Sequence, residues 1–211
     1  GTDSKYNLGL TGTDLETWTP SAWTIETVFK ASAGDISGGY HTIVGRDGYG
    51  VAGTADTNLA ALYFGIRPGN VIAIQYTDLG GINHNLFTPS WVVADRWYHM
   101  AATSDGTTLK LYLNYVEVAS LDMTGTSLDT ALAYDVDSAG DNYAWTVTRG
   151  MWGNSADLRS QGHVDRFLGL VDEVAISDGA LDASSFVVPI PEPATMLLLG
   201  LGAVSILKKR K

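Results

Sequence analysis

The fold class of this chain is decided by residues 97–114, which read Trp97-Tyr98-His99-Met100-Ala101-Ala102-Thr103-Ser104-Asp105-Gly106-Thr107-Thr108-Leu109-Lys110-Leu111-Tyr112-Leu113-Asn114. The Asp-Gly pair at the centre is a turn signal, and the runs on both sides are rich in apolar and aromatic residues. After the turn, Leu109, Leu111 and Leu113 alternate with other residues, which gives the strand one apolar face. The segment therefore predicts an antiparallel hairpin that packs one face against a core.

Similar apolar runs recur along residues 1–186. Gly-Gly, Asp-Gly and Pro-Gly pairs separate them, and no long stretch before the C-terminus has a helical period. We therefore expect an all-β fold in which two antiparallel sheets form a jelly-roll sandwich. The expected strands are 23–31, 41–46, 60–66, 71–77, 97–103, 109–114, 116–121, 144–149 and 167–177.

The composition agrees with one all-β domain and a short appendage. Of 211 residues, 45% are hydrophobic and 24 are glycine, enough for a core and many tight turns. Because cysteine is absent, the fold cannot depend on disulfides or thiolate metal sites. Residues 1–186 hold nine Lys and Arg against 22 Asp and Glu. This acidic body repels nucleic acid and is compatible with neutral glycans, cationic partners or Ca²⁺, although acidity also simply keeps an exported domain soluble.

The C-terminal residues divide into three parts. A proline-rich linker at 187–193 precedes an uncharged apolar run at 194–207, and four basic residues follow at 208–211. The run predicts a short hydrophobic helix of about 21 Å, whereas a full membrane span needs about 20 apolar residues. Snorkelling basic side chains make up the difference, with the basic end in the cytoplasm and the body outside. The alternative is an ordinary buried helix, which the four consecutive charges disfavour.

The tail resembles a PEP-CTERM sorting signal. The resemblance rests on Pro191-Glu192-Pro193, the apolar segment and the basic cluster. It implies that an exosortase, a membrane protease/transpeptidase, recognises Pro191, Glu192 and Pro193. It also implies export from a bacterium, transient anchoring in the membrane, and delivery to the cell surface or extracellular matrix.

The body resembles the laminin-G-like, concanavalin A-like family of lectin and glucanase sandwiches. The resemblance is carried by residues 23–30, by 96–101 with 111–114, and by 167–176. The family usually has Asn-Gly after the central hairpin, whereas this chain has Asn114-Tyr115. Because a tight turn there needs positive φ, which tyrosine resists, we expect the turn to be rearranged or Tyr115 to be displayed for contact.

The same resemblance points to a calcium site. In related domains an Asp at the position of Asp172 helps to bind a structural Ca²⁺, and Asp3 is a conceivable partner because the termini of such sandwiches meet. Hard oxygen ligands suit Ca²⁺. The alternative is that Asp172 hydrogen-bonds to a neighbouring loop.

Sequence patterns that would indicate catalysis are missing. The glucanases of the superfamily carry Glu-x-Asp-x-x-Glu or Glu-x-Asp-x-Glu on one strand, and no two glutamates here fit that spacing. The four histidines form no metalloprotease motif, and we interpret them as structural or incidental. The chain also has no phosphate-binding loop and no nucleophile elbow.

Aromatic side chains remain as a means of binding. Trp23 and Trp97 lie on expected core strands, so they are predicted to be buried. Glycan contact is expected at aromatic residues near loops or strand ends, namely Trp91, Tyr115, Tyr143, Trp145 and Trp152. The sequence thus predicts a non-catalytic surface module that binds extracellular polysaccharide or a surface protein. Two alternatives stay open: a glycoside hydrolase with an atypical pair such as Asp172 and Glu173, and a purely structural matrix component.

Overall fold

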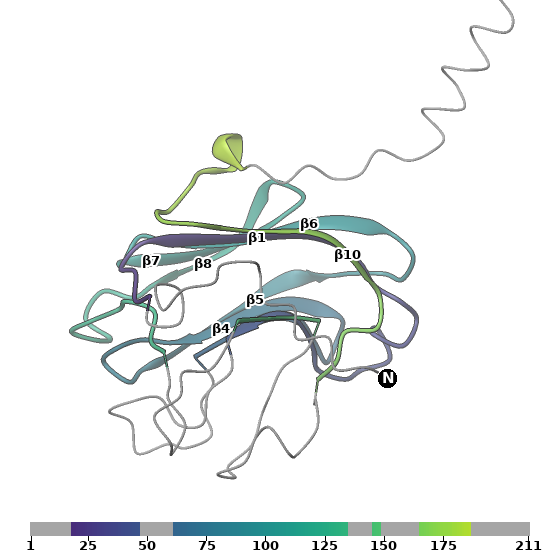
Figure 1. The fold of residues 1–211 in the computed structure, drawn as a ribbon, viewed down its shortest axis with the longest axis horizontal. Helices are drawn as coiled ribbons and strands as arrows, with labels where there is room; N and C mark the ends of the chain where they lie inside the picture. Colours follow the sequence, from purple (N-terminus) through teal and green to yellow (C-terminus); the bar gives the residue numbers. More distant parts are fainter. Residues whose placement is uncertain (1–17, 47–60, 135–144, 149–164, 187–211) are drawn as a thin grey trace, which may run out of the picture.

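Two antiparallel sheets lie face to face in the computed structural model (Figure 1), which describes residues 18–46, 61–134, 145–148 and 165–186. The first sheet has the strand order β10-β1-β6-β7-β8, with bounds Leu170–Ser177, Trp23–Lys30, Trp97–Ser104, Thr108–Leu113 and Val116–Asp122. The second has the order β5-β4-β3-β2-β9, with bounds Asn83–Trp91, Val71–Thr77, Leu62–Arg67, His41–Arg46 and Trp145–Val147. A short 3-10 helix, η1 (Ala183–Ser185), follows β10. This arrangement confirms the predicted all-β sandwich.

The β6–β7 hairpin forms as the sequence predicts. Ser104 lies opposite Leu109 and Ala102 opposite Leu111, in antiparallel register. In the turn, the Asp105 carboxylate accepts hydrogen bonds from the Thr107 hydroxyl and from the backbone N–H of Thr107, at 2.7 and 2.8 Å. These bonds lower the pKa of Asp105, because they favour its ionised form.

The core lies between the sheets and comes from alternate strand residues. Trp23, Ile25 and Phe29 of β1 are fully buried, and the Trp23 ring meets the ring of Tyr76 edge-on, with centroids 5.3 Å apart. Each such side chain contributes about 1.5–3 kcal/mol by leaving water. The prediction for Trp23 is therefore confirmed. The prediction for Trp97 is not, because this side chain is only partly buried at the start of β6.

The structure adds β5, which the sequence does not predict. Residues 83–91 are rich in polar residues and include Pro89, a combination that argues against a central strand. Strand β5 is the edge of the second sheet, and an edge strand tolerates a proline because the missing N–H needs no partner there.

The expected strand 167–177 is shared between the two sheets. The Phe167 N–H donates to the Thr148 carbonyl, next to β9 of the second sheet, and Arg166 just before it bridges to Thr42. Strand β10, in contrast, begins only at Leu170 and pairs with β1 of the first sheet. The chain crosses between the layers at Gly169, where a Cβ atom would lie 2.1 Å from the Lys30 carbonyl oxygen. The crossover explains why β10 starts later than the apolar pattern suggests.

Of the two outcomes expected for the turn after β7, a rearranged turn is not what the structure shows. Asn114 and Tyr115 have φ of 49° and 67°, and Leu113 pairs with Val116 across them. Two positive φ values in a two-residue loop are the requirement of a type I′ turn. The tyrosine tolerates this conformation because its ring stacks on His99, with centroids 4.3 Å apart.

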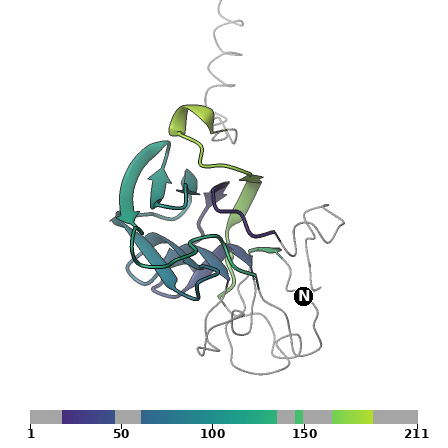
Figure 2. The same ribbon diagram turned by 90° about the vertical axis from the view of Figure 1, so that its left-hand side faces the viewer.

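After β10 the chain folds back over the outer face of the first sheet, as Figures 1 and 2 show. We call residues 178–186 the strap. The Thr24 hydroxyl holds it, donating to the Gly179 carbonyl at 2.7 Å and accepting from the Leu181 N–H at 2.8 Å. At its end, the Phe186 ring packs edge-on against Tyr112, at 5.0 Å between centroids.

The strap covers a polar pair on that face. Glu26 and His99 are fully buried although they point away from the core, and His99 Nε2 donates to Glu26 Oε2 at 3.1 Å. Tyr115 stacks on the His99 ring, and the Phe186 centroid lies 5.4 Å from it. The rings of Tyr115 and Phe186 thus shield the hydrogen bond between His99 and Glu26 from water.

Candidate functional site

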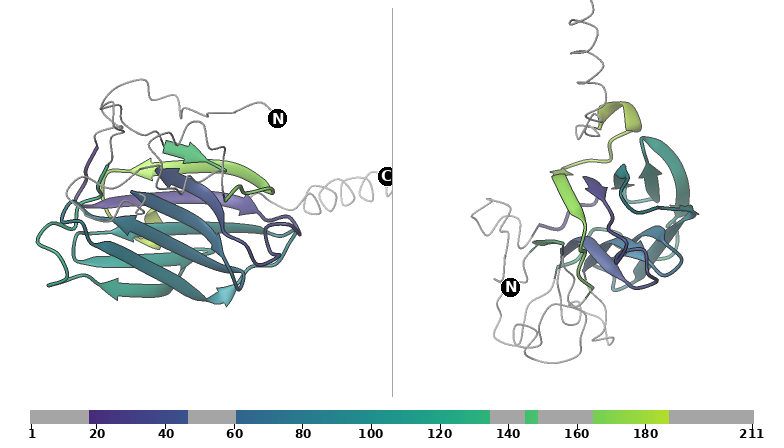
Figure 3. Two further views of the ribbon diagram at one scale, coloured as in Figure 1. Left: turned by 90° about the horizontal axis from the view of Figure 1, so that it is seen from below. Right: turned by 90° about the vertical axis from the view of Figure 1, so that its right-hand side faces the viewer.

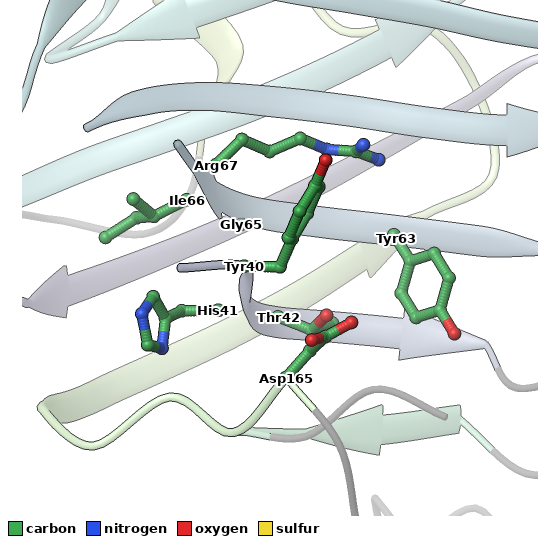
Figure 4. Close-up of a pocket in the computed structure, with 8 residues that line it drawn as sticks. All are labelled: Tyr40, His41, Thr42, Tyr63, Gly65, Ile66, Arg67 and Asp165. Atoms are coloured by element: carbon green, nitrogen blue, oxygen red, sulfur yellow. The ribbon is translucent and has the colours of Figure 1, made fainter. Parts of the chain in front are cut away.

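A pocket opens on the outer face of the second sheet, where β2 and β3 run past the segment that precedes β10 (Figure 4). Figure 3 shows this sheet from below. The pocket volume is about 420 Å³, within the range of roughly 300 to 1,000 Å³ that is usual for small-molecule sites. Its lining residues in the described part of the chain are Tyr40, His41, Thr42, Tyr63, Gly65, Ile66, Arg67 and Asp165.

Strand alternation explains why side chains of β3 reach this face. Leu62 and Phe64 are fully buried in the core, so Tyr63 and Arg67 point outward. The antiparallel register of β4 with β5 places Phe87 on the same face, where 45% of the residue is exposed.

The close approach of β2 to β3 depends on Gly65. A β-bulge shifts the register between Thr42 and Val44 and brings the β2 backbone onto this glycine. A Cβ atom at Gly65 would lie 2.1 Å from the His41 carbonyl oxygen and 2.9 Å from the Thr42 Cα. Only glycine leaves room for this crossing, which sets the start of β2 beside the end of β3.

Arg67 is the central cation of the pocket. Its guanidinium lies 5.2 Å from the Tyr40 ring centroid and 5.7 Å from that of Phe87, and it donates a hydrogen bond to Gln75 Oε1. Figure 4 shows the Tyr40 hydroxyl directed toward the guanidinium. Burial lowers the pKa of Arg67, and nearby Tyr40 and Asp165 oppose that shift.

Asp165 stands at the opposite wall. Its φ of 51° is left-handed, a conformation that aspartate tolerates better than most residues, and its carbonyl accepts from the Thr42 N–H at 2.7 Å. Burial raises the pKa of the Asp165 carboxyl, although the neighbouring His41 and Arg67 oppose the rise. The carboxyl is thus held closer to its neutral form than a surface aspartate.

A second buried aspartate fixes the segment that carries Asp165. The Asp35 carboxylate accepts from the Ser32 N–H at 2.8 Å and from the Leu168 N–H at 2.6 Å. His41 Nδ1 donates to the Arg166 carbonyl at 2.7 Å. These bonds tie the loop after β1 and the start of β2 to residues 165–168, so the pocket wall is built before any ligand arrives.

This arrangement can hold a ring with one apolar face and several hydroxyl groups. Tyr40 and Phe87, which are 51% and 45% exposed, offer aromatic surfaces beside Arg67, while Arg67 and Asp165 offer hydrogen bonds. Glycoside hydrolysis requires two carboxyl groups flanking the bond. Among the described lining residues Asp165 is the one carboxyl group.

The structure separates the aromatic residues predicted to bind glycan. Trp145 is 6% exposed and packs in the core, with its ring 6.3 Å from that of Trp18 and 5.3 Å from the Arg46 guanidinium. It therefore has little surface to offer a ligand. Tyr115 lies on the first sheet against His99, away from the pocket. Trp91 is the last residue of β5, and its side chain lies outside the described part.

The described part of the structure does not bring the remaining predicted site residues together. Tyr143, Trp152, Asp3 and the motif at 191–193 (Pro191, Glu192 and Pro193) lie outside them. Asp172 is exposed at a β-bulge of β10, where the register with β1 shifts. Within the described residues no group of three or more His, Asp or Glu could hold a metal ion. The calcium site at Asp172 and Asp3 stays a prediction.

Sequence reasoning missed the residues that shape the pocket, namely Tyr40, Arg67, Phe87 and Asp165. One signal was available, because β3 alternates core residues with Tyr63, Gly65 and Arg67, which marks an outward face carrying an aromatic ring and a cation. The pairing that brings this face to the other segments is not visible in any local pattern.

Family models match both parts of the chain. The model described as the concanavalin A-like lectin/glucanases superfamily matches residues 3–185. The PEP-CTERM protein-sorting motif matches residues 189–211, which confirms the predicted signal for export and for a membrane-associated place at the cell surface. Among curated proteins no sequence matches this one. None of the described segments forms a helix that is long and apolar enough to cross a membrane.

Solved structures share the fold at low sequence identity. The CBM40 domain of the Ruminococcus gnavus IT-sialidase, bound to α2,3-sialyllactose, gives a TM-score of 0.56 at 15% identity, over 81% of this chain and 82% of that domain. A protein from Bacteroides ovatus named for carbohydrate binding gives 0.51 at 18% identity, over 79% of this chain and 40% of the other. This chain thus spans less than half of the Bacteroides protein. At such identities the likeness concerns the fold alone.

Proposed function

The chain belongs to the concanavalin A-like lectin/glucanases superfamily, and from this membership we propose that it is a surface protein whose pocket binds carbohydrate without cleaving it. The observation that carries the proposal is the pairing of two exposed aromatic rings, Tyr40 and Phe87, with the hydrogen-bonding groups of Arg67 and Asp165. Aromatic faces stack on the apolar faces of sugar rings, and a few placed polar groups then select the hydroxyls. The carbohydrate-binding relatives in fold support this function.

The position of the strap agrees with display on a surface. Phe186 lies on the outer face of the first sheet, and the sorting motif begins at residue 189, three residues further along the chain. The pocket opens on the outer face of the second sheet. That sheet lies on the side of the sandwich opposite the strap (Figure 1). We propose that the tail, recognised by an exosortase at Pro191, Glu192 and Pro193, leaves from one face while the other faces the extracellular polysaccharide.

Removal of either exposed ring should weaken glycan binding without unfolding the protein. We expect Tyr40→Ala and Phe87→Ala each to lower the affinity for a polysaccharide about five- to thirtyfold, because a stacked ring contributes about 1–2 kcal/mol. Affinity electrophoresis of the full chain against a panel of neutral and acidic polysaccharides measures the effect. Thermal melting checks that the fold is intact.

A matched control is available on the other sheet. Val116 of β8 is 62% exposed and lies away from the pocket, so Val116→Ala should leave glycan affinity unchanged. If Val116→Ala weakens binding as much as Tyr40→Ala, the pocket is not the site. If no polysaccharide binds the unaltered chain, the proposed function is wrong.

We also propose that Asp172 takes part in binding Ca²⁺. A ligand that binds only the folded chain stabilises it, by about 2.7 kcal/mol at a hundredfold excess over Kd. We therefore expect a higher melting temperature in Ca²⁺ than in EDTA, and loss of that difference in Asp172→Ala. Asp178→Ala, at an exposed aspartate just after β10, is the control. Equal melting temperatures in Ca²⁺ and EDTA would contradict the proposal.

A further inference from the structure

We propose that the sugar bound in the pocket carries a carboxylate, and that the Arg67 guanidinium receives it. The inference rests on the proposed function and names the class of sugar that the same site selects. The guanidinium is held by neutral groups: Gln75 Oε1 accepts a hydrogen bond from it, and the rings of Tyr40 and Phe87 lie 5.2 and 5.7 Å from it. These partners orient its plane but carry no charge, and Asp165 on the opposite wall acts on it only from a distance, without an ion pair.

No carboxylate of the described residues forms an ion pair with this cation. The ion pairs found among them involve His41, His84, His99 and Lys110, and Arg67 takes part in none. A partly buried guanidinium between two aromatic rings is poorly solvated, so a ligand anion gains more there than at an exposed arginine. The guanidinium fork also matches a carboxylate in two parallel hydrogen bonds, which a sugar hydroxyl cannot reproduce.

The acidity of the chain as a whole does not oppose this inference. The net charge is −10, but charges that lie beyond about 8 Å are screened at physiological ionic strength. The contact inside the pocket is shorter than this distance and partly shielded from salt. The charges that decide the interaction are therefore those that line the pocket.

Asp165 should make the affinity for the acidic sugar depend on pH. The titratable and charged groups that face Asp165 are His41 of β2, Tyr63 and Arg67 of β3, and Tyr40 before β2. Burial already raises the pKa of Asp165, and an incoming carboxylate would raise it further because two adjacent carboxyls do not both ionise readily. At pH values between the pKa of Asp165 in the free chain and its pKa in the complex, binding therefore takes up a proton.

The direction of the pH effect follows from that uptake. Between the pKa of Asp165 in the free chain and its higher pKa in the complex, affinity for the acidic sugar falls as pH rises, about tenfold for each pH unit. Above the higher value the affinity is constant. Asp165→Asn should bind the acidic sugar without net proton uptake, because the amide does not titrate.

The test compares two oligosaccharides that differ only in the carboxyl group. One is a hexuronic-acid oligosaccharide, and the other is the same molecule with its carboxyl groups reduced to hydroxymethyl. Calorimetry with the unaltered full chain should show an affinity about ten- to a hundredfold higher for the acidic probe, as expected for a hydrogen-bonded charge pair. In two buffers of different ionisation enthalpy, the acidic probe alone should show proton uptake.

Variants then assign the preference to one side chain. Arg67→Gln should bind the two probes equally, and Arg67→Lys should retain part of the preference because it keeps the charge without the fork. If the unaltered chain binds both probes equally, and Tyr40→Ala weakens both, the inference about the carboxylate is overturned while the carbohydrate site stands. If neither these probes nor any polysaccharide binds, the proposed function itself fails. Preference retained in a folded Arg67→Gln would also overturn the role of this arginine.

Discussion

Replacing Glu26 with leucine should lower the free energy of unfolding by about 3–5 kcal/mol, one of the two largest effects expected in this chain. Glu26 and His99 are both fully buried under the strap, and the 3.1 Å hydrogen bond from Nε2 to Oε2 satisfies one of the two ring nitrogens. In the described structure His99 Nδ1 is already buried without a hydrogen-bond partner, so loss of the carboxylate leaves both ring nitrogens unsatisfied. Urea unfolding of the full chain measures the loss.

A double-mutant cycle separates this pair from simple packing. If the hydrogen bond is the cause, Glu26→Leu with His99→Leu should cost less than the sum of the single changes, by about 1–3 kcal/mol, because both polar partners are gone. The exposed pair Lys110–Glu117 is the control, and Glu117→Ala should cost less than about 1 kcal/mol despite a 3.2 Å contact. Equal costs for Glu26→Leu and Glu117→Ala would contradict a buried, coupled pair.

The burial of this pair shows what a local pattern cannot predict. Glu26 alternates with Trp23 and Ile25 along β1, and this alternation directs its side chain away from the core. Whether the outward Glu26 side chain is exposed to water depends on the strap, which lies more than 150 residues later in the chain. The strap is held in place by contacts such as the hydrogen bond from the Thr24 hydroxyl to the Gly179 carbonyl. The sequence therefore predicts the direction of the side chain but not its burial.

The fold was predictable because its main signals are local. The alternation of leucines in β7 and the Asp-Gly turn before it appear in the structure as predicted. Errors arose where tertiary context overrides local preference: β5 is an edge strand that accommodates Pro89, and the crossing at Gly169 divides one apolar run between two sheets. The tight turn at Tyr115 forms because stacking of its ring on His99 offsets the energetic cost of its positive φ.

The pocket was not predictable for a different reason. Its residues come from separate segments, and each is ordinary alone: Tyr40 precedes a strand, Arg67 ends one and Asp165 precedes a crossover. Phe87, which lies beside Arg67, belongs to an unpredicted edge strand. Composition drew attention to the tryptophans, because they have the largest aromatic surfaces. The Trp145 ring, however, is buried, because it packs in the core and against the guanidinium of buried Arg46.

The other large effect is expected from Gly65→Ala, because the added methyl group would meet backbone and not a movable side chain. Its nearest neighbours would be the His41 carbonyl oxygen at 2.1 Å, the Thr42 Cα at 2.9 Å and the Ile43 nitrogen at 3.0 Å. Strand β2 must then move away from β3, and we expect a loss of about 3 kcal/mol in the free energy of unfolding. Glycan binding should fall as well, since Tyr40 precedes β2 and must keep its ring beside Arg67.

Gly34→Ala is the matched control for this change. A Cβ atom at Gly34 would lie 3.0 Å from the tip of the Leu168 side chain, which is 62% exposed and free to rotate, so the cost should stay below about 1 kcal/mol. Urea unfolding and polysaccharide binding, measured on both variants, test stability and the pocket together. Loss of both properties in Gly65→Ala, and of neither in Gly34→Ala, would tie the pocket to the β2–β3 approach. A folded Gly65→Ala chain that binds glycan unchanged would mean that the ligand does not depend on this crossing, and the site would have to lie elsewhere on the sandwich.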